Sequence, residues 1–156
     1  MVIGNRIYIK HNRDADFKHI AFSYYDIETE KFEYLSEDVV GFGANDSKAY
    51  LIRATPKGDG SSENTNYDIT MYESDADSVG NKSSYRAVRN LNSHIPNGHV
   101  VDSISVYQNG LMLYLYLFTY PQNDDDWWGN YTVTHIGFNI GDGSFFDPTA
   151  AMKKLS

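Results

Sequence analysis

The chain has 156 residues, with 13 Lys and Arg against 21 Asp and Glu, and its formal net charge is −8. Such a balance disfavours nucleic-acid binding, which rewards clustered cations. The chain contains no Cys, which excludes disulfides, thiolate metal sites and cysteine nucleophiles. This length suits one domain, which we expect to span residues 1–156 and to bury roughly 70% of its unfolded surface.

The first residues, MVIGNRIYIK, lack the basic segment, apolar run and cleavage site of a secretory signal peptide. The longest apolar run, LMLYLYLF at 111–118, is shorter than the ~20 residues that a membrane helix needs. We therefore expect a soluble, acidic protein without a membrane span. It should be cytoplasmic, or released without a conventional signal peptide.

Strand-like segments follow one another along most of the chain. They are rich in β-branched and aromatic residues, and most are bounded by Gly, Asn, Asp or Pro, a pattern typical of a sandwich or small barrel. About eight strands are expected, at 7–10, 19–27, 31–35, 49–54, 67–73, 100–107, 111–120 and 131–140. The sequence predicts an all-β fold, a single-domain antiparallel β-sandwich that is jelly-roll-like, with a short C-terminal helix.

Turns, loops and helices are predicted between and after these strands. Two hairpins are expected, one from Tyr24 to Tyr34 and one from Tyr107 to Leu113 that turns at Asn-Gly. The segments 56–66 and 74–84, dense in Gly, Ser, Asn and Asp, read as loops. A short helix is predicted over 84–94, where Ser84 could cap it and Tyr85, Val88 and Leu91 recur at spacing three. The C-terminal helix should begin with Asp147 as N-cap and Pro148 as its first residue.

Strand 111–120 is apolar on both of its faces. Alternation places Leu111, Leu113, Leu115 and Leu117 on one face, and Met112, Tyr114, Tyr116, Phe118 and Tyr120 on the other. The leucine face suits a core between sheets. Three interpretations of the aromatic face stay open: it is covered by another part of the chain, buried in a subunit contact, or presented to a ligand.

The stretch YPQNDDDWWGNYT at 120–132 follows that strand and combines carboxylates with indoles. Sugars present CH faces that pack on aromatic rings and hydroxyls that bond to carboxylates and amides. The predicted ligand-binding residues are Asn123, Asp124, Asp125, Asp126, Trp127, Trp128, Asn130 and Tyr131. A purely structural alternative is a solvated acidic turn that one Trp anchors in the core. A third possibility is a Ca²⁺ site with Asp124 and Asp126 among its ligands, since Ca²⁺ takes six to eight oxygens.

Other metal and catalytic motifs are weak or absent in the sequence. The run from Asp75 to Gly80 imitates the start of an EF-hand, but Val79 and Arg86 stand where oxygen ligands are required. The pair His94 and His99 would need a further ligand to bind zinc. No Gly-x-Ser-x-Gly elbow, phosphate-binding loop, His-Glu-x-x-His or dinucleotide fingerprint is present.

The leading functional hypothesis is therefore non-catalytic carbohydrate recognition, lectin-like, through the acidic and aromatic loop. No cofactor is required, although Ca²⁺ could assist. The expected partner is a glycan or another hydroxyl-rich ligand. The alternative is a protein-interaction or toxin-type subunit that forms an oligomer through the aromatic strand face.

Overall fold

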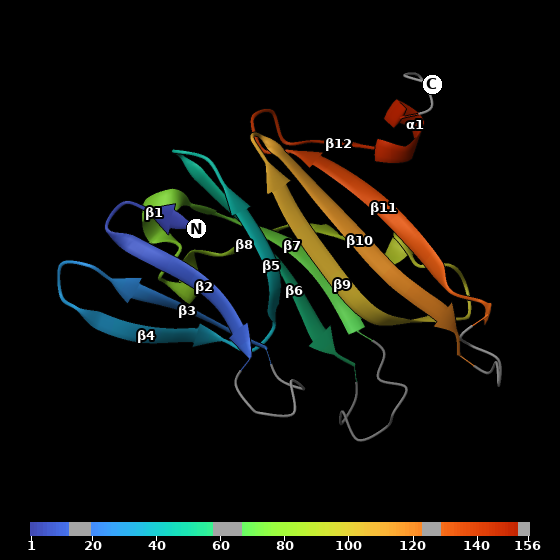
Figure 1. Ribbon diagram of the computed structural model, residues 1–156, viewed down its shortest axis with the longest axis horizontal. Coiled ribbons are helices and arrows are strands. Elements are labelled where there is room, and N and C mark those ends of the chain that lie inside the picture. The colour runs from blue at the N-terminus through green and yellow to red at the C-terminus, as the bar shows by residue number, and fades with distance from the viewer. Residues whose placement is uncertain (13–19, 58–66, 123–128, 153–156) are drawn as a thin grey trace.

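The computed structural model describes residues 1–12, 20–57, 67–122 and 129–152 (Figure 1). Within these ranges the chain forms twelve strands: β1 (Val2–Ile3), β2 (Arg6–Asn12), β3 (Ile20–Asp26), β4 (Lys31–Ser36), β5 (Val39–Ala44), β6 (Lys48–Pro56), β7 (Tyr67–Asp75), β8 (Arg86–Asn90), β9 (His99–Asn109), β10 (Met112–Pro121), β11 (Thr132–Asn139) and β12 (Ser144–Phe146). Three 3-10 turns, η1 (Ala76–Ser78), η2 (Lys82–Ser84) and η3 (Asn92–His94), and one helix, α1 (Pro148–Met152), complete the described elements.

The strands form three antiparallel sheets of four strands each. Sheet A has the order β1-β2-β3-β4, sheet B the order β5-β6-β7-β8, and sheet C the order β12-β11-β10-β9. The prediction of an all-β, sandwich-like fold with a short C-terminal helix is confirmed. Every hydrogen-bonded neighbour is consecutive along the chain, so each sheet is a meander, whereas a jelly roll pairs strands that are distant in sequence.

Sheet B lies between sheets A and C (Figure 1), and it contributes to a separate core on each of its faces. On strand β6, Tyr50 and Ile52 belong to the core shared with sheet C, whereas Ala49 and Leu51 belong to the core shared with sheet A. Side chains alternate between the faces of a strand, so neighbouring residues enter different cores. This explains why residues 49–52 form a continuous apolar run that is buried throughout.

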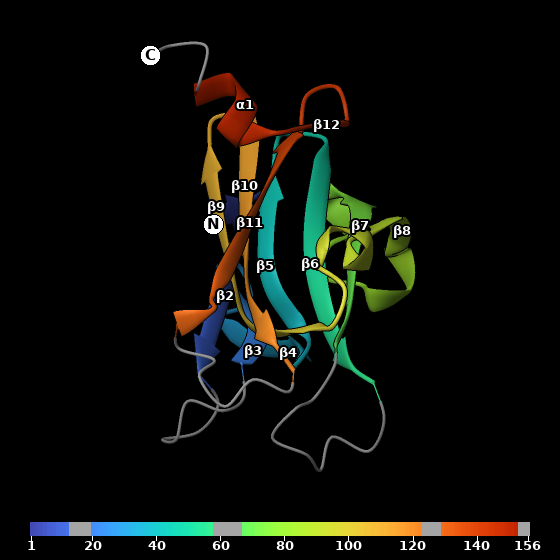
Figure 2. The same ribbon diagram turned by 90° about the vertical axis from the view of Figure 1, so that its right-hand side faces the viewer.

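Strands β5 and β9 approach closely and join sheets B and C along one side (Figure 2). A Cβ atom at Gly41 would lie 2.2 Å from Cγ2 of Val106, so a larger residue there has no room. The side-chain amide of Gln108 donates to the carbonyl oxygen of Ala44 at 2.7 Å and accepts from its N–H at 3.0 Å. Gln108 thus satisfies backbone groups at the end of β5.

Both predicted hairpins are present. Asp26 pairs with Lys31, and the Asp26 carboxylate accepts hydrogen bonds from the N–H groups of Glu28 and Thr29 in the turn. The other hairpin pairs Asn109 with Met112, and Gly110 has a φ of +57°. The positive φ that Gly supplies at low cost is therefore used in the turn itself.

The predicted helix over 84–94 is wrong. Residues 86–90 form β8 and pair with β7 at the edge of sheet B. The hydroxyl of Ser84 does not cap a helix but hydrogen-bonds with Ser74 Oγ, 2.7 Å away, and with the carbonyl oxygens of Ser78 and Asn81. The loop predicted over 74–84 is confirmed for most of its length, with η1 and η2 inside it, although Ser74 and Asp75 still belong to β7. Of the loop predicted over 56–66, residues 58–66 lie outside the described part of the chain.

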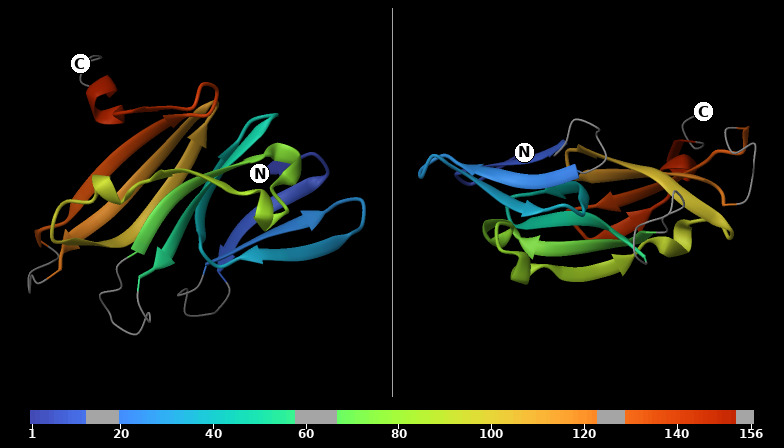
Figure 3. Two further views of the ribbon diagram at one scale, coloured as in Figure 1. Left: turned by 180° about the vertical axis from the view of Figure 1, so that it is seen from behind. Right: turned by 90° about the horizontal axis from the view of Figure 1, so that it is seen from below.

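Helix α1 begins as predicted, because the Asp147 carboxylate accepts a hydrogen bond from the N–H of Thr149 at 2.8 Å. The helix lies beside β11 at one end of sheet C, as the view from behind also shows (Figure 3). Among the described residues, no helix combines the length and the apolar character needed to cross a bilayer.

Candidate functional site

The face of sheet C that points away from sheet B carries a group of aromatic side chains. We call it the aromatic face; it comprises Tyr107, Tyr114, Tyr116, Phe118, His135 and Phe146. The opposite face of the same sheet holds Leu113, Leu115 and Leu117, which are fully buried in the core with sheet B. The predicted alternation of β10 is confirmed, except that Leu111 lies in the turn and is 51% exposed.

The strand register explains why these rings gather. Tyr114 stands opposite Tyr107 of β9 and Gly137 of β11, and Gly137 in turn stands opposite Phe146 of β12. Directly opposed residues of antiparallel strands share a face, with their Cβ atoms about 4.5–5.5 Å apart. The absence of a side chain at Gly137 leaves the space that the Phe146 ring occupies, since a Cβ atom there would lie 2.4 Å from two ring carbons.

The rings contact one another edge to face. The centroids of Tyr107 and Tyr116 are 5.7 Å apart at an interplanar angle of 76°, and those of Tyr114 and Phe146 are 6.0 Å apart at 88°. Tyr116 also meets the imidazole of His135 at 5.0 Å. Such T-shaped contacts fix ring orientations while leaving parts of the ring faces open.

This face is not covered as the leucine face is. The side chain of Tyr107 is 61% exposed, and those of Tyr114, Tyr116 and Phe118 are half-exposed. The described part of the chain therefore covers the aromatic face less fully than the leucine face. A ligand platform and a subunit contact are the two interpretations that give this face a function.

Tyr131 continues the aromatic face toward the predicted binding loop. Its ring centroid lies 6.4 Å from that of Phe118 and 6.2 Å from that of Tyr120. Burial raises the pKa of Tyr131, and a hydrogen bond with the Asp102 carboxylate raises it further. Asp102 is the extra residue of a β-bulge, because Ser103 pairs with Phe118 and Val101 with Thr119. The hydroxyl of Tyr131 is thus engaged by the protein, and its ring is the part that extends the face.

The predicted binding residues divide into two groups. Asn130 and Tyr131 are described, with Asn130 exposed and Tyr131 half-buried. The other six, Asn123, Asp124, Asp125, Asp126, Trp127 and Trp128, lie outside the described residues, and so do both predicted Ca²⁺ ligands. Of the predicted site, the structure therefore places only the end that joins β11.

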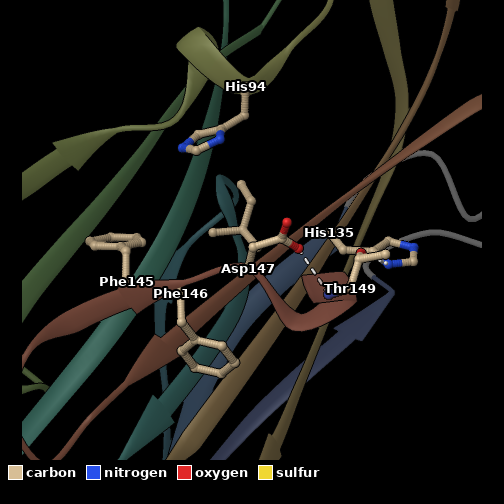
Figure 4. A pocket seen from close by; sticks show the side chains of 7 residues that line it. His94, His135, Phe145, Phe146, Asp147 and Thr149 are labelled. Carbon is tan, nitrogen blue, oxygen red and sulfur yellow. Dashed lines mark hydrogen bonds between the residues drawn. The ribbon is translucent and has the colours of Figure 1, made fainter. Parts of the chain in front are cut away.

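A pocket of about 450 Å³ lies at the end of sheet C where β12 stops and α1 begins (Figure 4). Its lining residues are His94, His135, Ile136, Phe145, Phe146, Asp147 and Thr149. This volume is within the range of roughly 300–1,000 Å³ that is usual for small-molecule sites. Because His135 and Phe146 belong to both, the pocket adjoins the aromatic face.

Local sequence explains the pocket. Pro148 has no N–H to donate to a strand ladder, and β12 ends two residues before it. The chain then turns into α1, and Thr149 Oγ1 lies 3.3 Å from Nδ1 of His135. The hydroxyl of Thr134 donates to the carbonyl oxygen of His94 at 3.3 Å, which ties η3 to β11 on the other side. The pocket thus presents phenyl rings, imidazoles, a hydroxyl and a carboxylate.

Metal binding finds no support in the described ranges, where no three His, Asp or Glu side chains lie close enough to hold an ion. His94 and His99, paired in the zinc hypothesis, have separate surroundings. His94 lines the pocket, whereas Nδ1 of His99 lies 3.2 Å from Thr119 Oγ1.

Sequence reasoning missed the contribution of Tyr107, His135 and Phe146 to this surface. The predicted hairpin contained Tyr107, but a turn at Asn109 and Gly110 would pair it with Met112; the observed register, with Asn109 opposite Met112, places it opposite Tyr114. Phe146 could not have been found, because its position depends on β12, a strand of three residues.

No protein-family model matches the sequence, and the searches of curated proteins and of solved structures found no match.

Proposed function

We propose that this protein is a non-catalytic, lectin-like protein that binds a glycan on the aromatic face of sheet C. The observation that carries the proposal is the row of rings at Tyr107, which is exposed, and at Tyr114 and Tyr116, which are half-buried, with edge-to-face contacts on one face of the sheet. Sugar rings offer apolar CH faces that pack on such rings, and their hydroxyls need donors and acceptors nearby. The adjoining pocket supplies these polar groups from His94, Asp147 and Thr149.

The loop at 123–131 extends this proposed site. Tyr131 links the aromatic face to it, and Trp127 and Trp128 would add further stacking surfaces at the same end of the sheet. The run Asp124 to Asp126 would bond to sugar hydroxyls, directly or with Ca²⁺ as a bridge. Removing Ca²⁺ with a chelator distinguishes direct bonding to the sugar from bonding through the metal.

A glycan array tests the proposal. The intact protein is screened with and without EDTA, and Trp fluorescence is recorded with each glycan that it retains. Selective retention of a glycan supports the proposal, and loss of that retention with EDTA indicates that Ca²⁺ takes part. Retention of no glycan on the array contradicts the proposal.

Paired variants then locate the site. Tyr107→Ala removes a tyrosine that is 61% exposed on the aromatic face, and Tyr34→Ala removes one that is 50% exposed on sheet A. Tyr107→Ala should weaken retention about tenfold, equivalent to about 1.4 kcal/mol, while Tyr34→Ala leaves it unchanged. Trp127→Ala and Trp128→Ala should stay folded and lose retention if the loop takes part. Equal effects of the two Tyr variants would place the ligand elsewhere.

A second candidate function is subunit association through the same face. It is favoured by Val133, which stands opposite Phe118 on the aromatic face and is 41% exposed. Strand β12 pairs with residues 137–139 of β11, and no described strand pairs with residues 132–136 on that edge. This alternative predicts a defined oligomer by light scattering at micromolar concentration, dissociated by Tyr116→Asp. A monomer at all concentrations would exclude it.

A further inference from the structure

The second half of the chain has an unusual distribution of charge. All thirteen Lys and Arg residues of the protein lie within residues 6–89 or at positions 153 and 154, so residues 90–152 contain none. The same segment contains six Asp residues, at 102, 124, 125, 126, 142 and 147. Because it supplies every strand of sheet C, this sheet has carboxylates and no cation of its own.

Three of these carboxylates are described, and all are exposed: Asp102, Asp142 and Asp147. Asp102 interacts with Tyr131 at one end of the aromatic face, and Asp147 lines the pocket at the other. Asp142 accepts hydrogen bonds from the N–H and hydroxyl of Ser144, which lower its pKa. Negative charge thus borders the rings at both ends of the sheet.

Three tyrosine rings on sheets A and B lie beneath cations of the protein itself. Arg6 lies over Tyr24 at 4.6 Å, Arg53 over Tyr72 at 5.1 Å and Lys82 over Tyr34 at 5.6 Å. Among the described residues, a cation lies over a ring of sheet C at Phe145, 4.1 Å from Arg89 of β8. Phe145 packs on Phe138 in the core and so points away from the aromatic face.

We infer that the aromatic face selects a cationic glycan, an oligomer of amino sugars, over neutral and acidic glycans. This inference rests on the proposed function and names its ligand class. The faces of Tyr107 and Tyr116 attract a cation through their ring quadrupoles, and no cation from their own sheet competes for them. Acidic sugars such as uronates would meet carboxylates with no Lys or Arg of sheet C to offset them, which penalises them as like charges.

Four probes of similar length separate the contributions of sugar ring and charge. They are a neutral N-acetylglucosamine tetramer, a glucosamine tetramer with trimethylated amines, a galacturonic acid tetramer and tetralysine. Trimethylation fixes the positive charge, so one pH of about 7.5 serves all four. Dissociation constants of the intact protein are measured by calorimetry at low and at high salt.

The trimethylated tetramer should bind at least fivefold more tightly than the neutral one, and this advantage should shrink at high salt because screening weakens exposed charge interactions. The galacturonic acid tetramer should not bind. Asp147→Asn should reduce the advantage of the cationic sugar, whereas the matched variant Asp46→Asn, in an exposed turn between β5 and β6, should not.

Each other outcome has a definite meaning. Equal or tighter binding of the neutral tetramer overturns the inference and leaves the proposed function standing. Binding of tetralysine as tight as that of the cationic sugar also overturns it, since charge alone would then suffice. If none of the three sugars binds and the array is silent, the proposed function fails and the inference fails with it.

Discussion

Tyr116 of β10 meets two rings from different strands at their edges, Tyr107 of β9 and His135 of β11, and its contact with the His135 imidazole is the closer, at 5.0 Å between centroids. The ring is therefore held in one orientation by both neighbouring strands. A ring fixed in this way forms a stacking surface with little conformational entropy left to lose on binding.

Under the proposed function, replacing Tyr116 with Ala should abolish most glycan retention while leaving the protein folded. The side chain is half-exposed, so its loss should lower the free energy of unfolding by about 1–2 kcal/mol, less than a core truncation. Tyr116→Phe keeps the ring and should retain most of the affinity. The measurements are binding on the array and urea denaturation; unchanged binding by Tyr116→Ala would remove this ring from the site.

Gly137 should not tolerate a side chain, because a Cβ atom would lie 2.4 Å from the Phe146 ring. Gly137→Ala should lower the free energy of unfolding by about 1–3 kcal/mol through displacement of that ring. In a Phe146→Ala background the same change should cost less than about 0.5 kcal/mol, since the clash is gone. A double-mutant cycle by urea denaturation measures the difference, and equal costs in both backgrounds would contradict the packing described.

Two leucines of the same sequence run should respond very differently to truncation. Leu115 is fully buried between sheets B and C, whereas Leu111 is 51% exposed in the hairpin turn. Leu115→Ala should cost about 2–5 kcal/mol. Leu111→Ala should change the stability by less than about 0.5 kcal/mol. Thermal and urea unfolding of both variants give the comparison, and a large cost at Leu111 would mean that this turn is covered in solution.

Tyr85 should make the protein sensitive to alkali. Burial raises its pKa to about 12, and its hydroxyl donates to the carbonyl oxygen of Val79 at 2.8 Å. An unfolded Tyr ionises near pH 10, so the unfolded chain releases this proton first and stability falls as the pH rises from about 10 through 12. This group should account for up to about 2 kcal/mol of the loss.

The variant Tyr85→Phe isolates this contribution. It should be less stable than the wild type by about 1 kcal/mol at pH 8, because a hydrogen bond is lost. Between pH 10 and about 11.5 its stability should fall less steeply than that of the wild type. Urea denaturation at a series of pH values shows the two slopes, and parallel curves would mean that Tyr85 ionises as an exposed tyrosine does.

Sequence patterns predicted the long strands well and the short ones poorly. The eight predicted strands correspond to β2, β3, β4, β6, β7, β9, β10 and β11, whereas β1, β5, β8 and β12 were not predicted. Strand β5 was missed because Gly41 and Gly43 depress its β propensity. These glycines are required by packing, since Cβ atoms would lie within 2.6 Å of Val106 and Leu113.

The helix was wrongly predicted over 84–94 because Tyr85, Val88 and Leu91 recur at spacing three, and this spacing has another cause. Tyr85 packs on the core with sheet A, Leu91 is buried in the core with sheet C, and Val88 is 41% exposed. The three residues therefore belong to different surroundings and do not form one apolar stripe. The conformation of residues 86–90 is decided by pairing with β7, which is too far away in the sequence for a local pattern to reveal.

The candidate site was predicted in part. Alternation along β10 identified Tyr114 and Tyr116, and the structure confirms that they share a face. The pocket beside them was not predicted, because it forms where η3, β11, β12 and α1 meet. The proposed role of residues 123–128 remains a prediction from the sequence.

The meander order of the three sheets has a consequence for how the chain is made. Sheet A uses residues 2–36, sheet B 39–90 and sheet C 99–146, so the residues of each sheet are synthesised before those of the next. Every hairpin closes over a short stretch of chain, which keeps its entropic cost low. The core between sheets A and B needs only residues up to 90, whereas the core between sheets B and C needs the last third of the protein. The sheet that carries the aromatic face is therefore the last to be synthesised.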